Sequence, residues 1–169
     1  MSSEALNPII SLHENASAFF EKIYQKNSKQ MECKKGCSKC CETDISVFEI
    51  EADRIREWFL SQEVEVKNKF KEEWQKPGDK KNCTFLVEDS CTVYEARPLI
   101  CRTQGLPLFL SSENSLDYCP LNFTEGNPEK SDWLNLERMN TLLSIAAKSQ
   151  KKEERISLKN LKKELIGIH

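Results

Sequence analysis

The segment Cys33-Lys-Lys-Gly-Cys37-Ser-Lys-Cys40-Cys41 places four cysteines within nine residues. Thiolates bind zinc and iron well, and spacings of two or three residues let one tight turn direct several sulfur atoms at one point. Gly36 and the lysines around it suit such a turn. The segment therefore predicts a metal-binding loop, and we work outward from it.

Four further cysteines lie between residues 83 and 119, so the fold has to bring them back if they are to act with the first segment. Four sulfur atoms suffice for a tetrahedral zinc ion or a [4Fe–4S] cluster. Eight can supply one site with spare thiols, or two sites, and thiols alone do not choose between zinc and iron. The candidate metal ligands are Cys33, Cys37, Cys40, Cys41, Cys83, Cys91, Cys101 and Cys119.

The first residues of the chain show no basic region followed by an apolar stretch, which favours a cytoplasmic protein. Cytoplasmic thiols stay reduced, so the cysteines point to metal or redox chemistry rather than to a disulfide framework. The adjacent Cys40 and Cys41 are also geometrically poor disulfide partners for each other.

At 169 residues the chain is long enough to bury a core without disulfides, and we expect one domain over residues 1–169. Its metal-binding core is expected at about residues 30–122, followed by helices at about 128–166. The net charge of −2 and the mixed signs of the charged residues argue against nucleic-acid binding. No window approaches 18 uninterrupted apolar residues, so we expect no membrane contact.

Apolar residues that recur every three or four positions predict several amphipathic helices. A capping box at Ser46-Val-Phe-Glu49 predicts the start of the second helix, and Asn127-Pro128 predicts the start of a long later one. Helices are expected at about 7–27, 46–60, 66–76 and 127–149, with one helical turn at 99–102 and an apolar stripe at Leu158, Leu161 and Leu165.

Short apolar runs on either side of polar turns predict two β-hairpins, one formed by residues 84–87 and 92–94 and one by 106–110 and 115–118. The fold class expected is mainly α with small β-hairpins, that is α+β, in a single metal-centred domain. Its two cysteine-rich segments are flanked by helices.

The cysteines belong to a longer pattern, Cys33-x3-Cys37-x2-Cys40-Cys41, then Cys83, then Cys91-Thr-Val-Tyr94-Glu-Ala-Arg97-Pro98-Leu-Ile-Cys101-Arg102. This pattern resembles a bacterial cysteine-cluster family described as a zinc- or iron-chelating domain. The resemblance covers roughly residues 33–102, with Cys119 as a final member, and departs from the family at Thr84, where members often have proline. It implies that the cysteines chelate zinc or an iron–sulfur cluster.

The motif is also partly similar to one in the flagellin lysine methylases, in which an iron–sulfur cluster is expected, but the similarity transfers no catalytic residue. The spacing of Cys33, Cys37 and Cys40 matches that of radical S-adenosylmethionine enzymes as well. Those enzymes carry an aromatic residue where this chain has Lys39, and the barrel pattern of alternating strands and helices is missing, which argues against radical chemistry.

Arg97 and Arg102 accompany the thiols and could offset the negative charge of a sulfur-ligated metal or bind an anion. The leading hypothesis is a metal-binding protein whose cellular role the sequence does not specify. The alternative is an iron–sulfur redox protein, or a lysine methylase-like protein-modification enzyme or its accessory. Whether the protein is an enzyme stays open.

The segment from Lys148 to Lys163 carries seven positive charges against two negative ones. Such a run is typical of a solvated helix face, and it could also offer a basic edge to an acidic protein partner. A third hypothesis is therefore a zinc-stabilised interaction module that uses this basic C-terminal helix.

Overall fold

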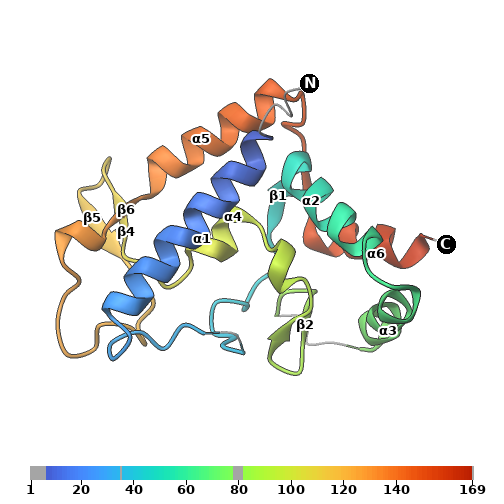
Figure 1. Cartoon of the computed structure of the whole chain (residues 1–169), viewed down its shortest axis with the longest axis horizontal. Coiled ribbons are helices and arrows are strands. Elements are labelled where there is room, and N and C mark those ends of the chain that lie inside the picture. The colour runs from blue at the N-terminus through green and yellow to red at the C-terminus, as the bar shows by residue number, and fades with distance from the viewer. Residues whose placement is uncertain (1–6, 35, 78–81, 169) are drawn as a thin grey trace, which may run out of the picture. The chain divides into compact units, whose positions relative to one another are not determined.

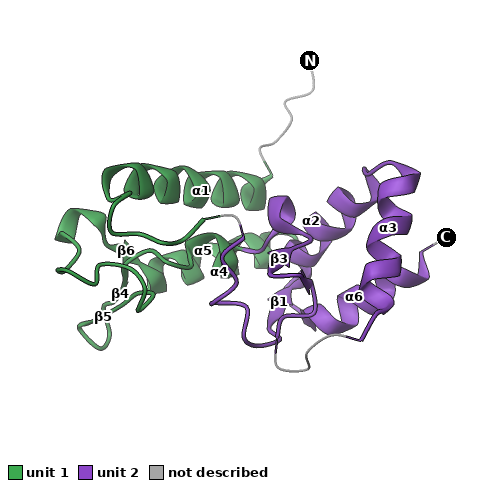
Figure 2. Ribbon diagram, turned by 90° about the horizontal axis from the view of Figure 1, so that it is seen from below, with its two compact units in different colours: residues 1–34, 99–151 green, residues 35–98, 152–169 purple. Residues whose placement is uncertain are grey.

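The computed structural model describes residues 7–34, 36–77 and 82–168 (Figure 1). The expectation drawn from the first six residues lies outside this part of the chain. Two compact units are present (Figure 2): unit 1 comprises Met1–Lys34 and Leu99–Lys151, and unit 2 comprises Lys35–Pro98 and Lys152–His169. The expectation of a single domain stays a prediction.

Unit 1 begins with helix α1, Pro8–Lys26, as the periodicity predicted. The Asn7 side chain caps it by accepting from the Ile9 backbone N–H at 3.3 Å, and Pro8 occupies the first turn, where its missing N–H costs nothing. The apolar face of α1 packs against α4, Leu99–Thr103, and α5, Leu136–Ser149.

The small sheet of unit 1 contains the predicted second hairpin, formed by β4, Leu108–Leu110, and β5, Ser115–Asp117. The structure adds β6, Leu134–Asn135, which runs parallel to β4. Apolar side chains from the sheet and from α1 form a core with Ile23, Met31, Leu106, Leu108 and Phe123 at its centre.

The predicted start of the long helix at Asn127-Pro128 was wrong. A 3-10 helix, Lys130–Asp132, and β6 occupy this region, and α5 begins only at Leu136. The Leu134 N–H donates to the Pro107 carbonyl oxygen at 2.8 Å, so pairing with a distant segment holds the backbone extended. Asn135 then caps α5 by accepting from the Arg138 N–H at 2.8 Å.

In unit 2 the predicted capping box was also wrong, because Ser46 lies in a strand. This strand, β1 (Ser46–Phe48), pairs antiparallel with β7 (Arg155–Ser157), and Ser46 faces Ser157 across the ladder. The pairing keeps the backbone extended up to Phe48. Helix α2 therefore begins at Glu49 and runs to Leu60, and its N-cap residue makes no side-chain cap bond.

The hairpin between the later cysteines of unit 2 was predicted in part. Its strands are β2, Leu86–Val87, and β3, Ser90–Cys91. Glu88 and Asp89 between them have φ of 46° and 59°, a left-handed pair of the kind that suits the twist of a two-residue hairpin. The predicted strand at 92–94 is absent from this described segment, because Thr92 closes the hairpin by donating its N–H and its hydroxyl to the Phe85 carbonyl oxygen. A 3-10 helix, Tyr94–Ala96, follows.

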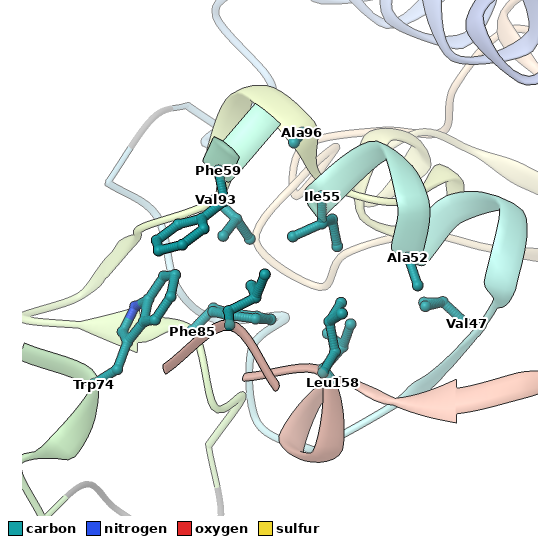
Figure 3. Packing of buried hydrophobic residues seen from close by; sticks show 11 residues of the cluster. Val47, Ala52, Ile55, Phe59, Trp74, Phe85, Val93, Ala96 and Leu158 are labelled. Atoms are coloured by element: carbon teal, nitrogen blue, oxygen red, sulfur yellow. The ribbon is translucent and has the colours of Figure 1, made fainter. Parts of the chain in front are cut away.

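The core of unit 2 lies between α2, the predicted helix α3 (Val64–Gln75) and α6 (Leu158–Gly167). Figure 3 shows Trp74 beside Phe59 and Phe85, with ring centroids 5.3 and 5.2 Å apart respectively. The predicted apolar stripe of α6 is confirmed, since its three leucines are buried here. Cys83 and Cys91 pack directly on this core, so the same apolar side chains that stabilise unit 2 also position two thiols.

The architecture is α+β, as predicted from the sequence: helices dominate, and the sheets have two or three strands. None of the helices in the described ranges is long and apolar enough to cross a membrane.

Candidate metal centre

All eight cysteines lie in described parts of the chain, and the structure shows them as thiols rather than disulfides. Unit 1 holds Cys33, Cys101 and Cys119. Unit 2 holds Cys37, Cys40, Cys41, Cys83 and Cys91. Unit 2 therefore contains cysteines from both cysteine-rich segments of the sequence.

Backbone and side-chain hydrogen bonds join the two cysteine-rich segments within unit 2. The Cys83 N–H donates to the Cys41 carbonyl oxygen at 2.7 Å, and the Ser38 hydroxyl donates to the Asp89 carboxylate at 3.0 Å. The first segment turns at Gly36, whose φ of 94° is left-handed and suits glycine, as expected for a tight cysteine loop. This contact between the segments brings Cys41 within electrostatic reach of Cys40, Cys83 and Cys91, and these four thiols are here called the four-thiol cluster.

The two adjacent cysteines of the cluster interact through their side chains. The hydrogen bond from the Cys41 thiol lowers the pKa of Cys40 to about 6, while the same bond raises the pKa of Cys41. Burial and the nearby sulfur atoms of Cys40, Cys83 and Cys91 raise the pKa of Cys41 further. One thiolate is thus favoured in the cluster, and each additional negative charge is disfavoured.

Cys83 precedes β2 and Cys91 lies in β3, and each is followed by threonine and then an apolar residue. Burial raises the pKa of Cys83, and it raises the pKa of Cys91 to about 11. A backbone hydrogen bond from Phe85 opposes the rise at Cys83, and one from Val93 opposes it at Cys91. Each sulfur atom therefore accepts a hydrogen bond from the backbone N–H of the residue two positions later in the chain. Such a bond stabilises the thiolate, the form of cysteine that binds a metal ion.

Arg97 supplies positive charge to the cluster. Its guanidinium carbon lies 3.7 Å from the centroid of the Tyr94 ring, so the two side chains stack. The charge of Arg97 acts to lower the pKa of both Cys40 and Cys91, after the larger effects of hydrogen bonding and burial. The other arginine of the motif, Arg102, belongs to unit 1 and donates to the Ser17 hydroxyl at 2.9 Å.

A cavity of about 790 Å³ opens beside the cluster and is lined in part by Cys83, Lys159 and Lys162. The Lys162 ammonium donates to the Trp74 carbonyl oxygen at 3.2 Å, and burial lowers its pKa. Lys162 is therefore engaged within unit 2, whereas Lys159 and Lys163 on the same helix are exposed.

The cysteines of unit 1 are distributed over three segments. Cys33 follows Met31 of the unit 1 core, Cys101 lies in α4, and Cys119 follows β5. The buried side chain of Asn122 donates to the Cys33 sulfur at 3.2 Å, and its backbone N–H donates to the Cys119 carbonyl oxygen at 2.8 Å.

No group of three or more histidine, cysteine, aspartate or glutamate side chains in the described ranges is arranged so that it could already hold a metal ion. The chemistry of the four-thiol cluster fits zinc or iron nonetheless. Partial burial and the neighbouring sulfur atoms favour the neutral form of Cys41, Cys83 and Cys91. A bound cation would reverse that preference because it stabilises the thiolates directly. The two N–H donors and Arg97 would act in the same direction.

Two residues near the thiols were not anticipated from the sequence. Lys162 lies close enough to Cys83 for its charge to favour the thiolate, and Asn122 contacts Cys33. The sequence placed Lys162 among the solvated lysines of a basic helix, and Asn122 stands in an irregular segment after Cys119. No local pattern marks either residue, because both contacts join segments that are distant in the sequence.

The fold and the eight thiols are those of a cysteine-rich α+β protein. The family described as "CxxCxxCC: Putative zinc- or iron-chelating domain" matches residues 32–120, more than half of the chain, and the chain belongs to this family. All eight cysteines fall within the matched residues. No curated protein and no solved structure matches the chain.

Proposed function

We propose that the four-thiol cluster of unit 2 binds the metal of this chelating domain, as a zinc ion or as an iron–sulfur cluster. The observation that carries the proposal is the hydrogen bond from the Cys83 N–H to the Cys41 carbonyl oxygen, which joins the two cysteine-rich segments. Four thiols are the number that either centre requires. Cys37, in the same loop, is a further candidate ligand.

The residues of the cluster have distinct roles in this proposal. Four thiolates around zinc leave a net charge of minus two, which Arg97 would offset in part. The N–H groups of Phe85 and Val93 would orient Cys83 and Cys91. A zinc ion would contribute folding free energy by joining the segments, and an iron–sulfur cluster would add one-electron redox chemistry.

The second candidate function is an iron–sulfur redox protein, or a protein-modification enzyme of the lysine methylase type or its accessory. The observation in its favour is the cavity of about 790 Å³ that Cys83 lines, since a substrate group placed there would lie next to the cluster. This candidate requires redox-active iron, because zinc has no redox chemistry.

Serine substitution in the cluster tests the proposal. We expect Cys83→Ser and Cys91→Ser each to lower cobalt or zinc affinity by more than about 100-fold, since loss of a ligand should exceed the effect of losing an outer-shell partner. Affinity is measured by competition with a chromophoric chelator under reducing conditions. Ser90→Ala, an exposed change beside Cys91, is the matched control and should bind as the wild type does. Wild-type affinity in both cysteine variants would contradict the proposal.

Replacing Arg97 tests charge compensation at the same centre. Arg97→Met keeps a long apolar side chain but removes the charge, and we expect it to weaken metal binding by about 10–100-fold. Arg97→Lys should recover part of the loss, because it restores the charge without the planar group that stacks on Tyr94. Arg54→Met is the control, because it also removes one positive charge from unit 2 but at a residue that pairs with Glu57 on α2. Equal affinity in Arg97→Met and the control would show that Arg97 has no such role.

A further inference from the structure

Thr92 connects the two turns of unit 2 that carry Cys83 and Cys91. It directly follows Cys91, and its backbone N–H and its hydroxyl donate to the Phe85 carbonyl oxygen at 3.0 and 2.9 Å respectively. The N–H of Phe85 donates to the Cys83 sulfur. Phe85 is therefore held through both of its backbone polar groups, its N–H by the Cys83 sulfur and its carbonyl oxygen by Thr92.

The Trp74 side chain fixes the direction of the Thr92 hydroxyl. Its indole N–H donates to the Thr92 Oγ1 at 2.9 Å, and an indole N–H can only donate. The hydroxyl hydrogen is therefore directed at the Phe85 carbonyl oxygen, which can only accept. Trp74 is 3% exposed, and its ring centroid lies 5.2 Å from that of the fully buried Phe85 (Figure 3). The core of unit 2 thus holds both ends of this chain of hydrogen bonds.

The turn at Cys91 depends on the same threonine. Val93, whose N–H donates to the Cys91 sulfur, follows Thr92 directly, and its side chain is buried in the same core. Cys91 also pairs with Leu86 across the hairpin, one residue beyond Phe85. A shift of Thr92 relative to Phe85 would therefore move both N–H donors, and with them both sulfur atoms.

We propose that Thr92 is a positioning residue, which aligns the Cys83 and Cys91 sulfur atoms as ligands of the chelated metal. Trp74 holds the Thr92 hydroxyl in place, and the Phe85 carbonyl oxygen links that hydroxyl to the Cys83 turn. The inference rests on the proposed metal binding at the four-thiol cluster. It extends that proposal to two side chains, those of Thr92 and Trp74, that do not themselves bind the metal.

A purely structural role for the Thr92 hydroxyl makes a different prediction. Removal of the hydroxyl would then lower the free energy of unfolding, but the metal affinity of the folded protein and the spectrum of the bound metal would not change. A positioning role changes both the affinity and the spectrum, because the coordination geometry depends on where the sulfur atoms are held.

The experiment compares variants of the full-length protein with Co²⁺ as the probe, under reducing conditions and well below the unfolding temperature. Thr92→Val keeps the shape of the side chain and the backbone N–H but removes the hydroxyl. We expect it to lower Co²⁺ affinity about 10–100-fold and to alter the thiolate-to-cobalt absorption at saturation. Thr92→Ser restores the hydroxyl and should recover most of the affinity. Thr84→Val is the matched control and should bind as the wild type does, because Thr84 is the corresponding residue of the Cys83 turn and lines the cavity.

Trp74→Phe supplies a second variant. It removes the indole N–H donor and keeps an aromatic ring beside Phe85, so it repeats the test if Thr92→Val does not fold. We expect it to lower Co²⁺ affinity by about 10-fold. Combined with Thr92→Val it should add little to the loss, because both changes break one chain of hydrogen bonds.

Wild-type Co²⁺ affinity in Thr92→Val or in Trp74→Phe would overturn the inference. A loss that Thr92→Ser does not reduce, or an equal loss in Thr84→Val, would overturn it as well. Wild-type protein that binds no Co²⁺ would instead contradict the proposed function itself, so the two failures are distinguishable.

Discussion

Removal of the metal with a chelator is expected to release the first cysteine-rich segment of unit 2, residues 36–45, from the hairpin segment that carries Cys83 and Cys91. Structural zinc sites contribute on the order of 10 kcal/mol to folding, which is comparable to the whole stability of an ordinary domain. Few backbone hydrogen bonds hold the segment from Gly36 to Asp44, whose residues lie in turns and irregular structure. The metal is therefore expected to account for most of the order in the segment from Gly36 to Asp44.

Hydrogen–deuterium exchange with and without a chelator, under reducing conditions, measures this effect. We expect the amide of Cys83, which donates to Cys41, to lose at least about 100-fold of its protection, since 1.4 kcal/mol corresponds to a factor of ten in an opening equilibrium. The α5 amides of unit 1 serve as the internal control. Loss of the metal is confirmed first. If exchange at Cys83 is then unchanged, the metal does not stabilise the hydrogen bond between Cys83 and Cys41.

Replacement of Phe85 by alanine is expected to be the most destabilising single change in the core of unit 2. The side chain is fully buried, and its ring centroid lies 5.2 Å from that of Trp74. Truncating a buried phenylalanine costs about 3–5 kcal/mol, through lost apolar burial and the cavity left behind. The Phe85 backbone also bonds to Thr92 and to the Cys83 sulfur, so the metal affinity should fall together with the stability.

Denaturant unfolding of the metal-loaded protein, paired with a chelator competition assay, separates the two effects of Phe85→Ala. Val64→Ala, at a side chain that is 60% exposed on α3, is the control and should change the free energy of unfolding by less than about 0.5 kcal/mol. A loss of under about 1 kcal/mol for Phe85→Ala would show that this residue does not anchor the core.

Elements whose signals are local could be predicted from the sequence. Helix α1 begins at Pro8 and ends at Lys26 because Asn7 caps it and its apolar residues repeat on one face. The strand pair β1 and β7 could not be predicted, since Ser46–Phe48 pairs with Arg155–Ser157, far along the chain. That pairing also displaced the predicted helix start from Ser46 to Glu49, and pairing of β6 with β4 moved the start of α5 in the same way.

In the candidate site, too, features with a local signal in the sequence could be predicted, and contacts between distant segments could not. The thiols were recognisable by type and spacing, and Arg97 was expected to supply charge to them. Their grouping depends on the bond between Cys83 and Cys41 and on the hairpin that carries Cys91, neither of which a local pattern specifies. The contact of Asn122 with Cys33 was missed because a lone asparagine in an irregular segment carries no signal of it.

Metal and acid-labile sulfide analysis of protein purified without oxygen tests the central claim most directly. The wild type should contain at least about one zinc per chain, or about four irons and four sulfides, and the Cys83→Ser, Cys91→Ser double variant should lose most of that content. Folded, fully reduced wild-type protein with less than about one-tenth of a metal ion per chain, or a double variant with undiminished metal, would contradict a metal centre at the four-thiol cluster.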